Sequence, residues 1–233
     1  MAKDRIALVT GANKGIGYEI ARQLGGKGFH VFVGARNPAA GKEAVATLQQ
    51  NGVSAEFVEI NVSDRASIQK AAKAVAARTD HVDVLVNNAA IMEDKASIID
   101  MDDDTFLRTL TTNVLGPIRV TQAFVPLLAN GSRACVVNLS SGLGQLSDME
   151  STYPAYSISK TAVNAVTRQF AAVLRDKGIT VNSVCPGWVK TDMGGPNAPR
   201  TVQQGADTVT WLATEAPRDL TGQFLRDRKQ IPW

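Results

Sequence analysis

Short runs of valine, isoleucine, leucine and phenylalanine alternate with alanine-rich stretches along the whole chain. Apolar residues fill these runs without strict apolar–polar alternation, which is typical of strands buried on both faces of a parallel sheet. The pattern predicts strands at residues 5–10, 29–33, 56–60, 82–86, 134–138, 179–184 and 223–225.

Apolar residues at helical spacing follow each predicted strand except the last. The predicted helices cover residues 15–25, 38–50, 64–78, 105–128, 154–177 and 202–213. Such alternation, with right-handed crossovers, gives a doubly wound α/β fold, here with a seven-stranded parallel sheet and helices on both faces. No linker or internal repeat interrupts the pattern, so we expect a single domain over residues 1–233.

The composition is that of an ordinary globular protein: 233 residues, of which 44% are hydrophobic and 20% charged. No apolar run approaches the roughly 18 residues of a membrane span, and the N-terminus lacks a signal-peptide pattern. We therefore expect a cytoplasmic protein with no membrane partner. The net charge of +3 comes from basic residues spread among acidic ones. This distribution argues against nucleic-acid binding and is compatible with an anionic cofactor.

The two cysteines and a run of aspartates have structural interpretations. Cys135 and Cys185 stand in apolar, β-branched runs and are expected to be small buried residues, without the spacing of metal ligands. The three aspartates at 102–104 precede a predicted helix, where carboxylates accept from free amides and meet the positive end of the helix dipole. The sequence therefore predicts no metal site.

A glycine-rich turn, TGANKGIG at residues 10–17, joins the first predicted strand to the first helix. Glycines there allow a sharp turn and close approach to a pyrophosphate, and the helix N-terminus offers free amides to that anion. Glycine is common in turns of any function, so it is the position of this turn that predicts a dinucleotide-binding Rossmann fold. The expected cofactor contacts are Gly11, Asn13, Lys14, Gly15, Ile16 and Gly17.

The end of the second predicted strand bears on the choice between NAD and NADP. NAD sites place an acidic residue about 20 residues past the glycines, on the ribose 2′-hydroxyl. Ala35 and then Arg36 stand there instead. A guanidinium pairs with a 2′-phosphate that a carboxylate would repel, and Lys14 adds a second cation. Together these residues favour NADP(H), although Arg36 alone could equally stack on adenine.

Tyr156 and Lys160 are spaced Y-x-x-x-K in a predicted helix, which places both on one face. A cation beneath a phenol lowers its pKa from the usual value near 10 and makes it a general acid/base. The same spacing is also common between surface residues with no chemical role. Ser140 favours the chemical interpretation, because it closes the fifth strand at the edge where open α/β sheets bind ligands. Asn113 lies inside a predicted helix, which indicates a functional role or a bend.

These motifs resemble those of the short-chain dehydrogenase/reductase family, and within it the carbonyl-reductase-like branch whose glycine loop reads TGANKGIG. The resemblance covers nearly the whole chain and includes NNAA at 87–90 and PGWVKT at 186–191. It implies NADPH-dependent reduction of a ketone or aldehyde, with a small and mostly apolar molecule as partner. An NADP-dependent alcohol dehydrogenase working in the oxidising direction would use the same residues. Non-catalytic NADP(H) sensors on this fold commonly lack the tyrosine and lysine.

The resemblance also implies roles for single residues. Tyr156 gives or takes the substrate proton, Lys160 lowers its pKa and binds the nicotinamide ribose, and Ser140 hydrogen-bonds the carbonyl oxygen. Asn113 holds a water in a proton relay. The remaining cofactor contacts that the resemblance implies are Asn61, Val62, Asn87, Ala89, Pro186, Gly187, Val189 and Thr191.

The chain departs from many relatives at Asn61, where they carry Asp for the adenine amine, and at residues 226–233, which replace a short glycine-rich tail. In relatives the helices at 105–128 and 154–177 pair across a two-fold axis, so we expect a homo-oligomer, either a dimer or a tetramer. Its small apolar surface would come from Ala162, Ala165, Val166 and Val173. Candidate walls of the substrate pocket are Leu143, Leu146, Met149, Tyr153, Trp188 and Met193.

Overall fold

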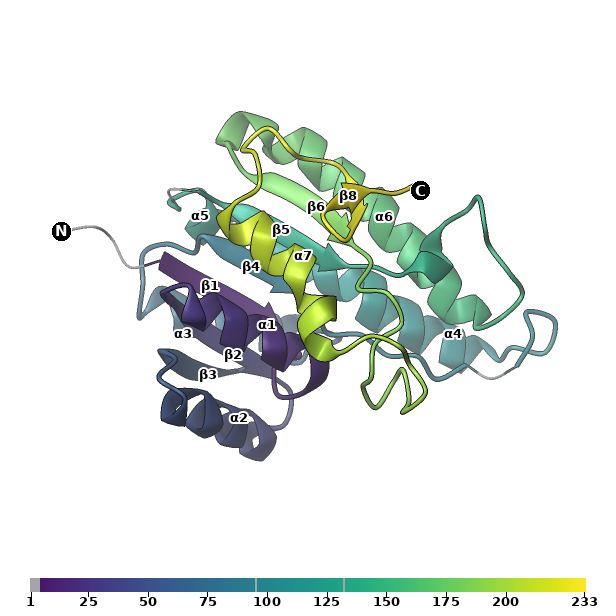
Figure 1. Ribbon diagram of the computed structural model, residues 1–233, viewed down its shortest axis with the longest axis horizontal. Helices are drawn as coiled ribbons and strands as arrows, with labels where there is room; N and C mark the ends of the chain where they lie inside the picture. Colours follow the sequence, from purple (N-terminus) through teal and green to yellow (C-terminus); the bar gives the residue numbers. More distant parts are fainter. Residues whose placement is uncertain (1–4, 95, 132) are drawn as a thin grey trace.

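A twisted, mostly parallel sheet forms the centre of the computed structural model, which describes residues 5–94, 96–131 and 133–233 (Figure 1). The strands lie in the order β3-β2-β1-β4-β5-β6-β7-β8. Their bounds are β1 (Arg5–Thr10), β2 (Phe29–Ala35), β3 (Ala55–Glu59), β4 (Val84–Asn87), β5 (Cys135–Leu139), β6 (Thr180–Val184), β7 (Phe224–Arg226) and β8 (Lys229–Gln230).

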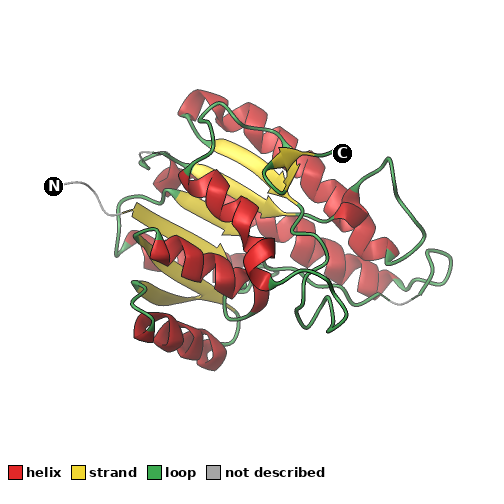
Figure 2. Ribbon diagram, viewed as in Figure 1, coloured by secondary structure: helices red, strands yellow, loops and turns green. Residues whose placement is uncertain are grey.

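Helices cover both faces of the sheet, as the sequence predicts (Figures 1 and 2). Helices α1 (Gly15–Gly26), α2 (Pro38–Gln50) and α7 (Val202–Thr214) pack on one face, and α3 (Arg65–Ala76), α5 (Gly116–Leu128) and α6 (Pro154–Leu174) pack on the other. In β1, Ala7 and Val9 belong to the first core and Ile6 and Leu8 to the second. Burial on both faces is why the strands lack an alternating pattern.

The seven expected strands are present and parallel, but the sheet has an eighth strand that the sequence analysis did not predict. Strand β8 pairs antiparallel with β7 and forms a hairpin. Its two turn residues, Asp227 and Arg228, have φ values of 52° and 62°, as the tight turns of two-residue hairpins require. A strand of two residues is too short to show a periodic pattern. The sequence analysis therefore noted residues 226–233 only as a departure from the tail of many relatives.

The predicted helix at 105–128 is interrupted. Helix α4 (Asp103–Leu110) passes into a π-helical turn at Thr111–Leu115, and α5 then begins at Gly116. Asn113 lies in this turn, so the bend that its low helix propensity suggested is real. Asp102 caps α4 by accepting from the Thr105 amide at 2.8 Å, which confirms the structural interpretation of the aspartate run.

The chain reverses its direction of travel across the sheet between β1 and β4, because β1 pairs with β2 on one side and with β4 on the other. Ligands of doubly wound sheets bind outside the carboxyl ends of the strands at such a switch point. The loops that follow β1 and β4 therefore frame the expected site.

Both cysteines are buried, as expected. Among the described residues no cluster of His, Cys, Asp and Glu could hold a metal ion, and no helix is long and apolar enough to cross a membrane. On α6, Ala165 and Val173 are exposed and Ala162 and Val166 are partly buried, so the homo-oligomer stays a prediction.

Candidate active site

A cleft with a volume of about 730 Å³ follows the carboxyl edge of the sheet across the switch point. It collects fifteen of the residues predicted from the sequence: Gly11, Asn13, Lys14, Gly15, Ile16, Gly17, Arg36, Asn61, Val62, Ala89, Ser140, Tyr156, Lys160, Pro186 and Thr191. Four others, Asn87, Asn113, Gly187 and Val189, do not line it. A second hollow of about 780 Å³ lies at the opposite edge of the sheet, among Phe29, Ser54 and Arg78, away from this chemistry.

The glycine turn forms one end of the cleft. Gly11 and Gly15 have φ values of 64° and 59°, which side chains rarely adopt. A Cβ at Gly17 would lie only 2.5 Å from the Gly11 carbonyl oxygen. The side chain of Asn88 braces the turn by donating to the carbonyls of Thr10 and Gly11 at 2.8 and 3.1 Å. Since no side chain caps α1, its first amides remain available to an anion.

Arg36 follows β2 and lies exposed at the cleft, beside the buried Ala35. Lys14 is already paired: its Nζ lies 2.6 Å from Asp192 Oδ2, with both side chains exposed. Lys14 holds the pKa of that carboxyl below its usual value. Asp192 would therefore compete with a 2′-phosphate for the ammonium of Lys14.

Asn61, on the adenosine side of the cleft, makes a local turn. Its Oδ1 accepts from the backbone amide and the hydroxyl of Ser63, at 3.2 and 2.8 Å. The acceptor that the sequence analysis assigned to the adenine amine is thus partly used within the chain.

Tyr156 and Lys160 lie on the buried face of α6, where Nζ of Lys160 is 5.4 Å from the centre of the Tyr156 ring. The ammonium donates to the carbonyl of Leu139, the last residue of β5, at 2.7 Å. Both side chains are removed from water, with exposed fractions of 8% for Tyr156 and 3% for Lys160. This is the buried pair that the Y-x-x-x-K spacing predicts, not a pair on the helix surface.

Burial dominates the protonation of this pair. It raises the pKa of Tyr156 to about 12 and lowers the pKa of Lys160 to about 8, since it disfavours both charged forms. The pKa of Tyr156 therefore lies above its usual value, not below it as expected, and the assistance of Lys160 in catalysis stays a prediction. The phenol is protonated at neutral pH, which is the form that a proton donor needs.

The two serines after β5 have different partners. Ser140 lines the cleft, but its hydroxyl donates to the Lys160 carbonyl at 3.2 Å. The hydroxyl that hydrogen-bonds to the Tyr156 side chain belongs to Ser141, and this contact lowers the pKa of Tyr156. Ser141 also accepts from the Leu143 amide at 3.2 Å. The sequence analysis chose Ser140 and missed its neighbour.

Ser141 starts a short 3₁₀ helix, Gly142–Gly144, that returns the chain to α6. Gly144 lies directly against the backbone of Lys160, where a Cβ would be 2.7 Å from the Lys160 carbonyl carbon. The absence of a side chain at 144 therefore lets the loop that carries Ser140 and Ser141 pack onto α6.

Asn113 and Asn87 act inside the structure. Asn113 exchanges hydrogen bonds with the backbone of Ile91, both at 2.9 Å, and donates to the Ser159 hydroxyl at 3.0 Å. Both of its N–H groups are thus used, which leaves none for a relay water. Asn87 donates to the side chains of Thr121 and Asn138 at 3.1 and 2.8 Å, and so ties β4 to α5 and β5.

Residues 186–193 fold over the glycine turn after β6. A small parallel bridge joins Val189 to Arg200, and the Arg200 side chain lies against Gly187, where a Cβ would be 2.4 Å from its Cδ. These contacts turn Gly187 and Val189 away from the cleft, which leaves Pro186, Thr191, Asp192 and Met193 to line it.

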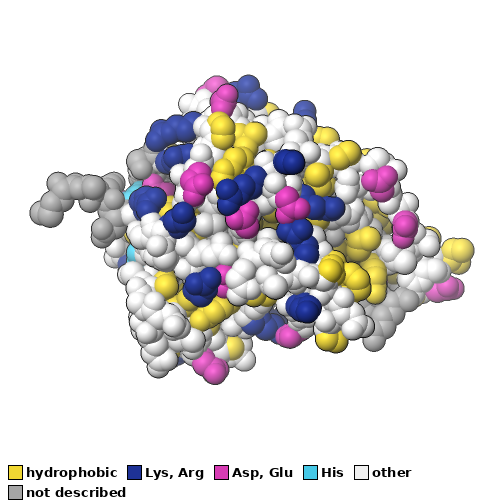
Figure 3. Space-filling model, in the orientation of Figure 1, with side chains coloured by type: hydrophobic (Ala, Val, Ile, Leu, Met, Phe, Trp, Pro, Cys, Tyr) yellow, Lys and Arg dark blue, Asp and Glu magenta, His cyan; other side chains and the backbone are white. Residues whose placement is uncertain are grey.

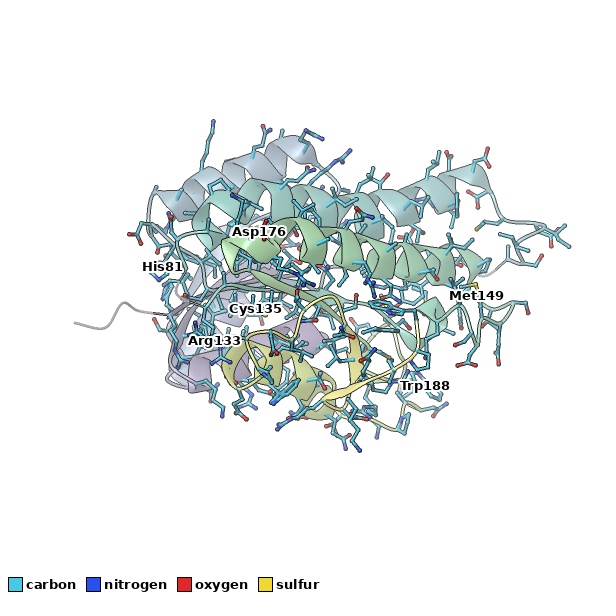
Figure 4. The ribbon with its side chains drawn as sticks, turned by 90° about the horizontal axis from the view of Figure 1, so that it is seen from above. His81, Arg133, Cys135, Met149, Asp176 and Trp188 are labelled. Atoms are coloured by element: carbon cyan, nitrogen blue, oxygen red, sulfur yellow. The ribbon has the colours of Figure 1, made fainter. Side chains whose placement is uncertain are left out.

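Exposed apolar side chains occur in the segments that follow β5 and β6, whose first residues line the cleft. Of the six predicted substrate walls only Met193 lines the cleft itself, while Leu146, Met149, Tyr153 and Trp188 are exposed. Met149 and Trp188 lie at one end of the molecule and His81 at the other (Figure 4). Hydrophobic side chains also gather on the right-hand part of the face in Figure 3. Such apolar side chains suit a substrate with little charge.

Fold and cleft together define a nucleotide-binding α/β protein with a tyrosine–lysine pair. The sequence matches the family model for short chain dehydrogenase over residues 5–201. It is 32% identical to the protein named carbonyl reductase (NADPH) 1 of Sus scrofa, covering 98% of this chain and 94% of that protein. The (+)-neomenthol dehydrogenase of Arabidopsis thaliana is 31% identical, with 97% of each chain covered. The chain therefore belongs to the short-chain dehydrogenase family.

Solved structures agree in fold. The NADPH-bound carbonyl reductase from chicken fatty liver superposes with a TM-score of 0.91 at 30% identity and covers all of both chains. An actinorhodin polyketide ketoreductase with NADPH gives a TM-score of 0.88 at 32% identity, with 97% of each chain covered.

The buried ammonium of Lys160 leads to a prediction about stability. The native pKa of about 8 lies below the usual lysine value, so the charged form destabilises the folded state until the pH rises above both values. Lys160→Met should therefore gain stability over the wild type at about pH 7, and this gain should shrink by on the order of 2 kcal/mol by about pH 10. Urea unfolding at both pH values measures the change. The exposed Lys190→Met is the control, and an equal gain at both pH values would contradict the depressed pKa.

Proposed function

We propose that this protein is an NADPH-dependent carbonyl reductase, which converts a ketone or aldehyde to an alcohol. The observation that carries the proposal is the buried Tyr156–Lys160 pair at one end of the cleft, with the glycine turn and the uncapped start of α1 at the other. The glycine turn offers a binding site for an anion, and Tyr156 in the same cleft offers a proton donor. This combination suits hydride transfer between a dinucleotide and a carbonyl.

The residues present suit NADPH, which supplies the hydride when it is bound. The turn at residues 11–17 would hold the pyrophosphate, because it lines the cleft beside the uncapped first amides of α1. Arg36 would bind the 2′-phosphate, residues 61–62 the adenine side, and residues 186–191 the nicotinamide carboxamide. Lys160 would hold the nicotinamide ribose. The NADPH named for the relatives supports this choice of cofactor.

Tyr156 would donate its phenolic proton to the substrate oxygen as negative charge develops there. The ammonium of Lys160 would stabilise the phenolate that remains. Ser141 would hydrogen-bond the substrate oxygen, since its hydroxyl already meets the phenol. Reduction needs a protonated phenol, and the raised pKa of Tyr156 keeps the phenol in that form at neutral pH.

Tyr156→Phe tests the proposed chemistry. The wild type should oxidise NADPH with at least one member of a panel of apolar ketones, aldehydes and quinones, followed by absorbance. The variant should lose on the order of 10² to 10⁴-fold in kcat, because the general acid is removed. Its affinity for NADPH, measured by fluorescence titration, should stay close to that of the wild type. A near-normal kcat in the variant would rule out Tyr156 as the proton donor.

The adjacent serines provide a matched pair of variants. Ser141→Ala should lower kcat about 10²-fold, because the carbonyl oxygen loses a donor in the transition state. Ser140→Ala should retain most of the activity, because its hydroxyl serves the Lys160 carbonyl. Kinetics of both variants with one substrate separate the roles. The opposite ranking would return the catalytic role to Ser140.

Cofactor preference tests the role of Arg36. A charge-assisted arginine contact contributes about 1.5–3 kcal/mol, so Arg36→Ala should weaken use of NADPH by roughly 10-fold or more and leave NADH nearly unchanged. Ala35→Asp should go further, since its carboxylate repels a 2′-phosphate and accepts from a free 2′-hydroxyl. The comparison uses kcat/KM for both cofactors in each protein. Equal losses for NADPH and NADH would mean that Arg36 stacks on adenine instead.

A further inference from the structure

Helix α6, which carries Tyr156 and Lys160, begins without a cap of its own. Tyr153 occupies the N-cap position in a left-handed conformation, with a φ of 49°, and no side chain there accepts from the helix. Pro154 follows and has no N–H group. The amides of the first turn therefore need acceptors from elsewhere in the chain.

A carboxylate from a distant segment supplies the acceptor. The amide of Ser157 bonds to the Tyr153 carbonyl at 2.8 Å. The two amides that remain, those of Ala155 and Tyr156, both donate to Oδ2 of Asp94, at 2.9 and 3.4 Å. Asp94 follows β4 and precedes Ala155 by 61 residues. One oxygen thus holds the first turn, including the backbone of the tyrosine.

The cap itself does not require a charged residue at position 94. The residue is only 3% exposed, and within the described part of the chain its second oxygen, Oδ1, is buried without a hydrogen-bond partner. The side chain of asparagine has a similar shape and could accept from the same two amides. A buried carboxylate with one unpaired oxygen is costly, which points to a use for the charge itself.

We propose that Asp94 is a positioning residue for Tyr156: its carboxylate holds the tyrosine backbone at the start of α6, and its buried negative charge disfavours a phenolate at that tyrosine. This role rests on the reductase function proposed above. It deepens that function by naming a residue that acts on the proton donor from outside the cleft, since Asp94 does not line it.

The groups around the phenol act in opposite directions. Burial raises the pKa of Tyr156 most, the hydrogen bond from Ser141 lowers it, and electrostatic interactions with Cys185 and Asp94 raise it further. Lys160 lies beneath the ring on the same helix and favours the phenolate. Glu93, beside Asp94, is turned outward and paired with Arg108 at 3.4 Å. Removal of the Asp94 charge should therefore ease ionisation of the phenol.

The experiment follows the phenol directly. NMR of the protein with ¹³C-labelled tyrosine, with and without NADP⁺, gives the alkaline titration of each of its three tyrosines. Tyr156→Phe assigns the signal, and Tyr18 and Tyr153 are internal references. Asp94→Asn should lower the midpoint of Tyr156 by about half a pH unit or more. The alkaline limb of kcat for reduction should move down by the same amount.

Asp94→Ala removes the cap as well as the charge. We expect kcat to fall by about 10-fold while the affinity for NADPH changes less than about twofold, because only the first turn of α6 moves. Asp102→Asn is the control, since Asp102 also caps a helix, α4, but is exposed and is not among the groups that shift the pKa of Tyr156. It should leave the Tyr156 titration and kcat unchanged.

An unchanged Tyr156 midpoint in Asp94→Asn would overturn the proposal, whatever the activity. Should Asp94→Ala fail to fold, the Asn variant still decides the question. The NMR readout needs no turnover, so a protein that reduces no carbonyl would defeat the proposed function while a shifted midpoint would still support the effect of Asp94 on Tyr156.

Discussion

The hydrogen bond from the Lys160 ammonium to the Leu139 carbonyl fixes α6 at the edge of the sheet where we propose that the chemistry occurs. A buried ammonium needs an acceptor, and the ladder of β5 ends at Leu139, so that carbonyl faces α6 at the edge of the sheet. The bond brings α6 to the end of a central strand, beside the switch point where the glycine turn lies. The phenol of Tyr156, one helical turn earlier, is thereby held at the same edge.

Much of the fold could be predicted because its signals are local. The helix at residues 38–50 has both its start and its extent in the sequence, with Asn37 as a cap and Pro38 at the first position. The parts that were missed carry little local signal. Five residues in a π-helical turn do not reveal their period, and the two residues of β8 show no alternation, so only contacts with other elements define them.

The residues of the candidate site also fall into two groups, those with a local signal in the sequence and those without one. The spacing of Tyr156 and Lys160 is a property of one helix, so the sequence shows it directly. The choice between Ser140 and Ser141 depends on where the strand stops and the chain turns, which a motif does not specify. Lys14 lies 178 residues from Asp192, and Asp94 lies 61 residues from the amide that it binds. Such pairs form only when the chain folds, and the pattern of apolar and polar residues along the sequence does not predict them.

Gly144 has a consequence for how substrate range can change in this protein. Its contact with the Lys160 backbone leaves no room for a side chain, so the first part of the loop after β5 is constrained by steric packing against α6. The outer arm of the same loop carries Leu146, Met149 and Tyr153 in exposed positions. Loops of this kind diversify where no packing depends on them. Substitutions from position 146 outward can therefore change these exposed apolar side chains without displacing Lys160, whereas a side chain at position 144 would first displace the backbone of α6.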